Sequence, residues 1–132
     1  MSDILINLTP HPMHIYGPDC PDRIEPGSVE PIAVIPVEPE ECRTRLGTVD
    51  LGRAEGGINY GAANIPVYIV RHGNTTNLPE RRPGVWYFVA LVVALANPQR
   101  HDLLVAYEAV RNLDGAMIGC RSLALPVGGD PQ

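Results

Sequence analysis

The sequence contains no lysine, so all ten of its basic residues are arginine. This absence excludes a lysine Schiff base, a P-loop lysine and a lysine general base, together with the enzymes that depend on them. Arginine carries a planar fork of donors that matches phosphate and carboxylate groups. A basic site in this chain therefore favours a small anionic ligand.

Cysteine is also scarce. Cys20, Cys42 and Cys120 are odd in number, widely spaced and without a CxxC pair, which supports neither a disulfide framework nor a zinc site. His11 and His14 lie three residues apart, but a strand or turn does not place such a pair on one face as a helix would. We therefore expect no metal, no cofactor and a reducing, cytoplasmic environment.

Long apolar runs and an excess of basic charge are missing as well. The opening MSDILINLTP has no basic segment followed by an apolar one, and the apolar run at residues 85–96 is too short to span a bilayer. The formal net charge is −5, whereas duplex DNA binding usually needs a strongly basic face. We expect neither a membrane nor duplex nucleic acid as a partner.

Charge is distributed unevenly along the chain. Residues 17–55 carry nine acids against four arginines, whereas residues 60–125 carry four acids against six arginines. The first segment is a candidate face for a protein partner, and the second is the candidate region for a small anion.

The hydrophobic pattern predicts a single compact domain over residues 1–132, with surface loops near 17–30 and 52–64. An Ala/Leu-rich stretch at 90–96 predicts a short helix, and Asp114-Gly115 predicts the turn of a hairpin between 109–111 and 116–124. We expect an α+β fold, with a mixed, mostly antiparallel β-sheet and one main short helix packed on it. Apolar alternation and β-branched residues predict its strands at 4–8, 13–16, 32–37, 44–51, 65–70, 85–89 and 103–106.

The stretch PVYIVRHGNTTN, residues 66–77, resembles the phosphohistidine motif of the histidine phosphatases. The resemblance implies that His72 accepts a phosphoryl group and Arg71 binds its oxygens, with His101 as second histidine and Glu80 as acid. About sixty residues follow His72, too few to build the rest of that larger fold. We interpret the motif as a strand ending in a solvated Arg-His pair, and keep a histidine-phosphatase-like phosphoryl-transfer enzyme as an alternative function.

Arg121 follows Cys120 in the last expected strand. The Cys-x5-Arg spacing of a cysteine phosphatase is absent, so we expect Cys120 to be a core thiol. Arg121 faces the other side, where it either binds a ligand or pairs with an acid such as Asp102 or Glu108.

Trp86 and Tyr87 open the strand after Gly84 and face opposite sides of it. Both can pack in the core, or one can offer a stacking surface for a base. A pocket for a nucleotide-like anion would combine one of these rings with Arg71, Arg111 and Arg121.

The opening ILINLTPHPMHIY and the closing RHDLLVAYEAVRNLDGAMIGCRSLAL resemble a family of small proteins from phages and GC-rich bacteria. Its members likewise open on Asn-Leu-Thr-Pro-His-Pro and close on a Gly-Cys-Arg-Ser-Leu strand. The resemblance implies no particular activity, but it points to Asn7, Thr9, His11 and Arg121 as site residues.

Our hypothesis is a non-enzymatic binding protein that acts in the cytoplasm, which would be the cytoplasm of the host cell if the protein is phage-encoded. Small phage proteins without an evident catalytic set often act by binding, and some sequester nucleotide second messengers of host immunity. The ligand would be a cyclic nucleotide or an ADP-ribose-type signal, and a homo-oligomer could complete the pocket. A protein–protein interaction or inhibitor module is the alternative function. The expected ligand-binding residues are Asn7, Thr9, His11, Arg71, Trp86, Tyr87, Arg111 and Arg121.

Overall fold

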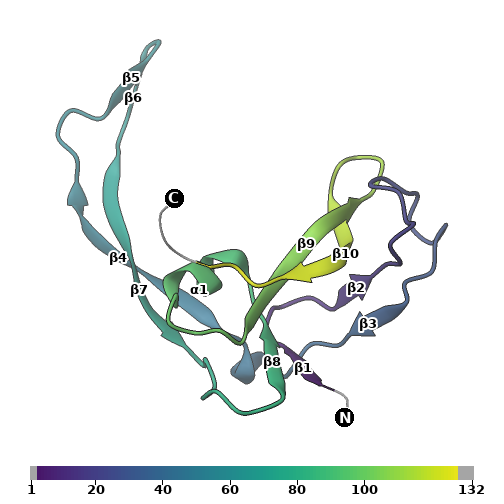
Figure 1. The fold of residues 1–132 in the computed structure, drawn as a ribbon. Helices are drawn as coiled ribbons and strands as arrows, with labels where there is room; N and C mark the ends of the chain where they lie inside the picture. Colours follow the sequence, from purple (N-terminus) through teal and green to yellow (C-terminus); the bar gives the residue numbers. More distant parts are fainter. Residues whose placement is uncertain (1–2, 128–132) are drawn as a thin grey trace.

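The computed structural model describes residues 3–127, and its centre is a six-stranded sheet (Figure 1). The strand order is β1-β8-β9-β10-β2-β3, so the first two strands of the chain lie on opposite sides of the C-terminal strands. The strands are β1 (Ile4–Asn7), β2 (Met13–Ile15), β3 (Ala33–Ile35), β8 (Val85–Phe88), β9 (Leu103–Arg111) and β10 (Met117–Ala124).

The sheet curls until its two edge strands meet. Asn7, the last residue of β1, forms an isolated bridge with Val37, which lies just beyond β3. The amide of Glu38 donates to the Asn7 carbonyl at 3.4 Å, and the amide of Thr44 donates to the Leu8 carbonyl at 3.2 Å. The result is a nearly closed, barrel-like sheet in which few strand edges stay free.

The expected α+β fold is wrong, because the protein is mostly β. Helical structure within residues 3–127 is limited to α1 (Leu91–Ala96) and one 3-10 turn, η1 (Glu40–Cys42). The main sheet is also not mostly antiparallel, since β1–β8, β8–β9 and β10–β2 are parallel pairs and only β9–β10 and β2–β3 are antiparallel. The pairs β1–β8 and β10–β2 join strands far apart in the sequence, and β8–β9 is connected through α1, so none of the three has the hairpin turn that imposes antiparallel direction.

Helix α1 joins the parallel neighbours β8 and β9. Its Ala and Leu residues favour a helix, and Pro98 prevents the helix from continuing. The side chain of Asn97 closes the last turn by donating to the Val93 carbonyl at 2.8 Å, and it donates to the Thr75 hydroxyl at 2.9 Å. Val93 and Ala94 are buried, whereas Leu91, Val92 and Leu95 on the outer side are 49% to 55% exposed.

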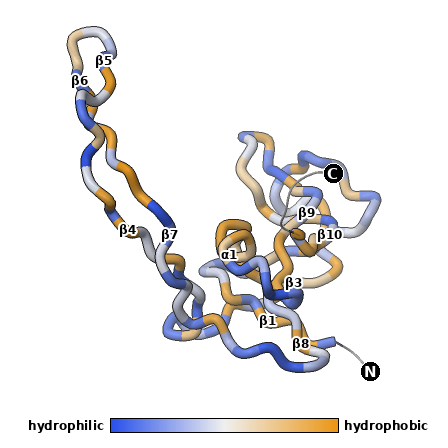
Figure 2. The backbone as a smooth tube through the Cα atoms, turned by 60° about the vertical axis from the view of Figure 1, so that its left-hand side comes forward, coloured by the Kyte–Doolittle hydropathy of each residue, from blue (hydrophilic) through white to orange (hydrophobic). Residues whose placement is uncertain are grey.

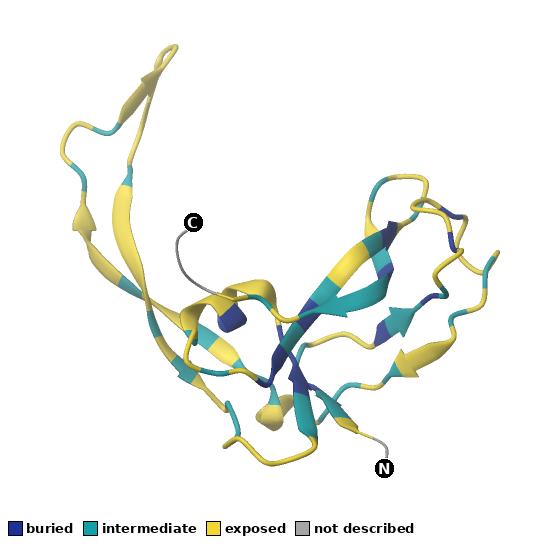
Figure 3. Ribbon diagram, viewed as in Figure 1, coloured by how far each residue is buried: buried dark blue, intermediate teal, exposed yellow. Residues whose placement is uncertain are grey.

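A long two-stranded ribbon projects from this body (Figures 1 and 3). It consists of β4 (Arg45–Arg53) paired antiparallel with β7 (Tyr68–Thr76), and the hairpin of β5 (Ile58–Tyr60) and β6 (Ala63–Ile65) forms its tip. We call residues 45–76 the arm. The base of the arm is half buried, with Leu46 packed against the core below α1, and its outer half is exposed on both strands.

Strand alternation divides the apolar residues of the body between the inside of the curled sheet and the side covered by α1. Phe88 packs inside with Met13 and Cys120, against apolar residues from all the other strands of the sheet. Tyr87 and Val89 face the helix, in a cluster that also holds Val93 and Leu103. The hydropathy colouring shows this apolar body, and it also shows apolar stretches along the arm (Figure 2).

Several local predictions are confirmed. The strand expected at 85–89 and the helix expected at 90–96 correspond to β8 and α1. The β9–β10 hairpin turns at Asp114-Gly115, where Gly115 has φ +92°. The strand expected at 65–70 is instead divided between β6 and β7, and the segment 52–64 contains β5 and part of β6.

One buried ion pair fixes the start of β9. Asp102 is 4% exposed, and its carboxylate accepts hydrogen bonds from Arg100 Nε at 2.8 Å and Nη2 at 2.7 Å. The Asp102 carbonyl accepts the amide of Tyr87 at 2.9 Å, which aligns β8 with β9. Burial opposes ionisation, but the hydrogen bonds from Arg100 prevail and hold the pKa of Asp102 below its ordinary value.

We predict that Asp102→Asn lowers the free energy of unfolding by about 2–3 kcal/mol at neutral pH, because Arg100 loses its anionic partner. Since the pKa of Asp102 is lowered on folding, its contribution is present above the unfolded pKa of about 4 and is lost as the pH falls through the folded pKa. Urea titrations at pH 7 and pH 3 should therefore show the difference between wild type and variant shrinking at pH 3.

Asp114→Asn is the matched control, because Asp114 is exposed in the hairpin turn. Its effect on the free energy of unfolding should stay below about 0.5 kcal/mol. A difference between wild type and Asp102→Asn that does not change with pH would contradict the prediction.

Candidate functional site

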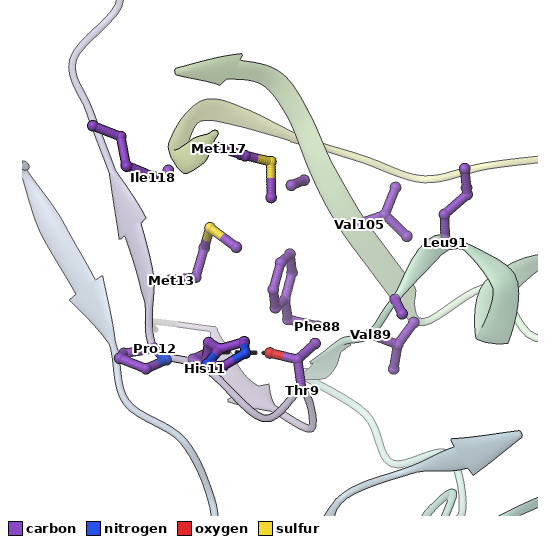
Figure 4. A pocket seen from close by; sticks show the side chains of 13 residues that line it. Thr9, His11, Pro12, Met13, Phe88, Val89, Leu91, Val105, Met117 and Ile118 are labelled. Carbon is purple, nitrogen blue, oxygen red and sulfur yellow. Dashed lines mark hydrogen bonds between the residues drawn. The ribbon is translucent and has the colours of Figure 1, made fainter. Parts of the chain in front are cut away.

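A pocket of about 470 Å³ opens between the turn before β2, the start of α1, and strands β9 and β10 (Figure 4). Its volume lies within the range of small-molecule sites, roughly 300–1,000 Å³. The lining side chains come from segments far apart in the sequence, which the curled sheet brings together.

The interior of the pocket is apolar and built around Phe88, Met13 and Met117, whose side chains point toward one another (Figure 4). Phe88 and Met13 belong to the core inside the sheet, and Met117 is 48% exposed at the pocket. Phe88 and Met13 are 2% and 8% exposed, so Met117 offers most of the open apolar surface, and a flat apolar or aromatic group would reach the Phe88 ring where the flexible thioethers move aside.

Thr9 and His11 form the polar part of the pocket wall. The hydroxyl of Thr9 lies 2.6 Å from the Asn7 side-chain oxygen and 3.1 Å from the His11 carbonyl, so its proton goes to one of these two acceptors. The turn they form is stiffened by Pro10 and Pro12. His11 is the one histidine among the described residues that line the pocket.

Asn7 lies beside the pocket but not in its wall. Its side chain is fully buried, and its amide donates to the carbonyls of His11 at 2.9 Å and Ile35 at 3.2 Å. Its side-chain oxygen accepts the amide of Thr9 at 2.9 Å. The structure thus uses Asn7 to join β1, the following turn and β3, rather than to present it to a ligand.

Arg111 and Arg121 are both occupied by other groups of the protein. Arg121 forms an ion pair with Asp22 at 2.6 Å and a longer one with Glu108 at 3.9 Å, and it donates to the Cys20 carbonyl at 2.9 Å. Hydrogen bonding to Asp22 raises the pKa of Arg121, so its charge is held firmly. Arg111 donates to the Gly115 carbonyl at 2.9 Å, across the β9–β10 turn.

The other expected site residues are spread over the molecule. Arg71 and His72 lie in the middle of β7 on the arm, exposed, and the strand continues beyond Gly73 rather than ending there. Trp86 lines a separate pocket of about 380 Å³ near Leu5 and Leu123. Tyr87 is fully buried, and its hydroxyl lies 3.3 Å from the Glu80 carbonyl as a donor.

The structure therefore brings Thr9 and His11 to one pocket with residues that sequence reasoning missed. We did not single out Met13, Phe88 and Met117, because an isolated methionine or phenylalanine in a sequence is usually a core residue. The available signal was the run from Thr9 to Met13, where two prolines flank a histidine directly before a strand. Proline-stiffened turns often hold polar groups at the rim of a site.

The remaining reactive groups lie elsewhere. Burial raises the pKa of the Cys120 thiol, and its complete burial confirms it as a core residue. Cys20, Cys42 and Cys120 are free thiols. Within residues 3–127, no three His, Cys, Asp or Glu side chains gather closely enough to hold a metal ion. None of the helices in that range has the length and apolar content to cross a bilayer.

Comparison with known proteins gives no match to a protein-family model, a curated protein or a solved structure. The likeness suggested by NLTPHP and GCRSL stays a prediction, and the function is argued from the geometry of the site.

We predict that Asn7→Ala lowers the free energy of unfolding by about 2–4 kcal/mol, because it leaves several buried backbone groups without partners. Asn7→Asp should destabilise as well, since it keeps the acceptor for Thr9 but removes both donors. Chemical denaturation measures both effects. Asn59→Ala, at the exposed tip of the arm, is the control and should leave the body's stability unchanged; equal effects of Asn7→Ala and Asn59→Ala would refute this role.

Proposed function

We propose that the protein binds a nucleotide-like small molecule in the pocket between β2, α1, β9 and β10, and that it acts by sequestering this ligand unchanged. The observation that carries the proposal is the pocket itself. It has the volume of a small-molecule site, an aromatic ring and two thioethers inside, and hydrogen-bonding groups on one wall.

The apolar interior supports a ligand with a flat ring. A base that enters beside Phe88 would be covered by Met13 and Met117, which adjust to its outline. Stacking of a base on an aromatic side chain contributes about 1–3 kcal/mol and tolerates different bases. This arrangement favours a ring that is held by shape more than by a fixed set of hydrogen bonds.

The wall formed by Thr9 and His11 supports a polar or anionic group on the same ligand. The Thr9 hydroxyl, whose proton is directed to Asn7 or to the His11 carbonyl, can accept a hydrogen bond from the ligand, and the imidazole of His11 can donate or accept one. Both are held by the proline-stiffened turn, so little conformational entropy is lost when they bind.

The composition of the pocket supports binding without turnover. Hydrolysis or phosphoryl transfer needs an acid or base together with groups that stabilise the developing charge. Among the described lining residues, His11 is the one side chain suited to act as an acid or a base. Arg71 and His72 lie outside the pocket. A cyclic nucleotide or an ADP-ribose derivative is the ligand class we propose, with the cytoplasm of a phage-infected cell as the setting.

A protein-interaction role is the second candidate, and the arm is the observation in its favour. Its outer half exposes large apolar side chains that no described part of the chain covers. Such exposure marks a contact surface.

The ligand proposal is tested by thermal-shift screening of the purified protein against mono-, di- and cyclic nucleotides and ADP-ribose derivatives. Each stabilising compound is then released by heat and examined by mass spectrometry. We expect at least one compound to raise the melting temperature and to be recovered intact. Recovery of a cleaved or dephosphorylated product would make the protein an enzyme, and no shift with any compound would remove the ligand proposal.

Two matched pairs of variants locate the binding site. Ala90 is exposed at the pocket and Ala96 is exposed at the other end of α1, so Ala90→Trp should block binding and Ala96→Trp should not. His11→Ala should weaken affinity about tenfold, or roughly 1.4 kcal/mol, whereas His14→Ala should not, because His14 lines a different pocket. Isothermal titration calorimetry measures these affinities. Equal loss within either pair would place the ligand elsewhere.

A further inference from the structure

The outer half of the arm exposes more apolar surface than a polar solvent favours. Seven large apolar side chains there are between 47% and 77% exposed. β-branched and aromatic residues of this kind favour strands whose faces are covered. The seven are Leu51, Ile58, Tyr60, Ile65, Tyr68, Ile69 and Val70.

The arm also lacks the support that a ribbon of its length requires. Strands β4 and β7 pair only with each other among the described strands, so each has one edge without a neighbour. An isolated two-stranded hairpin is marginally stable in water and normally needs a third strand or a packed surface. The outer halves of these nine-residue strands therefore have no covering surface among the described residues of this copy.

The body carries a second apolar surface next to the base of the arm. Leu91, Val92 and Leu95 on the outer side of α1 are about half exposed, and so is Met117 beside the pocket. Leu91 and Met117 both line the pocket, so this surface runs into its mouth. Figures 1 and 2 show α1 between the arm and the β9–β10 hairpin.

The arm and the body carry net charge of opposite sign, while the receiving surface on α1 is itself uncharged. The arm carries three arginines against two acids, whereas the other described residues carry twelve acids against seven arginines. Arg53 and Arg71 on the arm have no carboxylate within ion-pair distance among the described residues. A basic arm thus suits an acidic body of the same sequence.

We propose that the arm docks onto a second copy of this chain, across the outer side of α1 and the mouth of the pocket, and that the second arm does the same in return. A two-fold dimer allows both contacts at once, because each copy offers one arm and one receiving surface. With roughly 150 Å² for each of the seven side chains, about half of it exposed, one arm offers on the order of 600 Å² of apolar surface over its two faces, and roughly half of this lies on the face that docks. Two docked faces and the two receiving surfaces that they cover then reach roughly 1,200 Å² of total buried area, at which stable interfaces begin.

Docking also completes the site, a step that rests on the proposed function. The pocket of one copy holds no arginine among its described lining residues. The partner's arm brings one arginine, Arg53 on one face of the ribbon or Arg71 on the other, to the pocket mouth, where it binds the anionic part of the ligand through forked hydrogen bonds. Each pocket then takes its aromatic ring from one copy and its anion-binding arginine from the other.

The dimer is tested by sedimentation equilibrium of the full chain at low micromolar to 100 micromolar concentrations. We expect a two-fold mass for the wild type. Leu51→Asn with Ile69→Asn on the arm, or Leu91→Asn with Leu95→Asn on α1, should each yield a monomer with an unchanged circular dichroism spectrum of the body. Tyr107→Asn with Leu113→Asn is the matched control, since both side chains are about 60% exposed on the β9–β10 hairpin, and it should stay dimeric.

A wild-type monomer at the highest concentration overturns the proposal, and so does a dimer that survives both pairs of interface substitutions. Hydrogen exchange gives an answer that does not depend on variants. The amides of β4, β7 and α1 should lose protection on dilution, and uniform protection at all concentrations would also overturn the proposal.

Mixed dimers separate this proposal from the ligand proposal. A copy with Arg53→Ala and Arg71→Ala lacks the anion-binding groups, and a copy with Ala90→Trp has a blocked pocket, so neither should bind alone. Mixed together, they should bind one ligand per two chains, because the second copy lends its arginine to the first copy's open pocket. No recovery in a confirmed mixed dimer refutes the shared site, and absence of ligand binding by a dimeric wild type refutes the proposed function but leaves the dimer standing.

Discussion

The buried side chain of Asn7 is the contact on which the body of this protein depends. It joins the end of β1 to the carbonyls of His11 and Ile35, at the place where the first and last strands of the curled sheet meet. Without this junction between the two edge strands, β1 and β3 would each present an unpaired edge. The turn that carries Thr9 and His11 would also have no fixed position. The closure of the sheet and the shape of the pocket wall therefore share one cause.

The rest of the molecule divides into a body that buries most of its own apolar residues and an arm that leaves them exposed. In the body, alternation sends Phe88 inward and Tyr87 toward α1, so one strand serves two cores. In the arm, the same alternation exposes apolar residues on both faces, because no layer lies above or below it. No described residue outside the arm covers its outer half, and a second copy is the source that we propose for the missing layer.

The sequence predicted what depends on neighbouring residues. Pro98 ends α1 and Asp114-Gly115 turns the last hairpin, and both signals lie within a few positions of the structure they determine. It did not predict the parallel pairs or the arm, because these depend on partners far along the chain. The role of Arg121 was open for the same reason: Asp22, its closest partner, lies about a hundred residues away, and no local pattern reveals that contact.

The parallel pairs β1–β8 and β2–β10 have a consequence for how the chain folds during synthesis. The first strand must wait for residues 85–88 to leave the ribosome, and the second, which can pair early with β3, must wait for residues 117–124 to gain its other neighbour. Few of the N-terminal contacts are local, so the nascent chain cannot reach a stable intermediate early, and its folding is slow for its size. Prolines and acids are frequent between residues 17 and 41, and this composition disfavours aggregation of the segment before its partners are made.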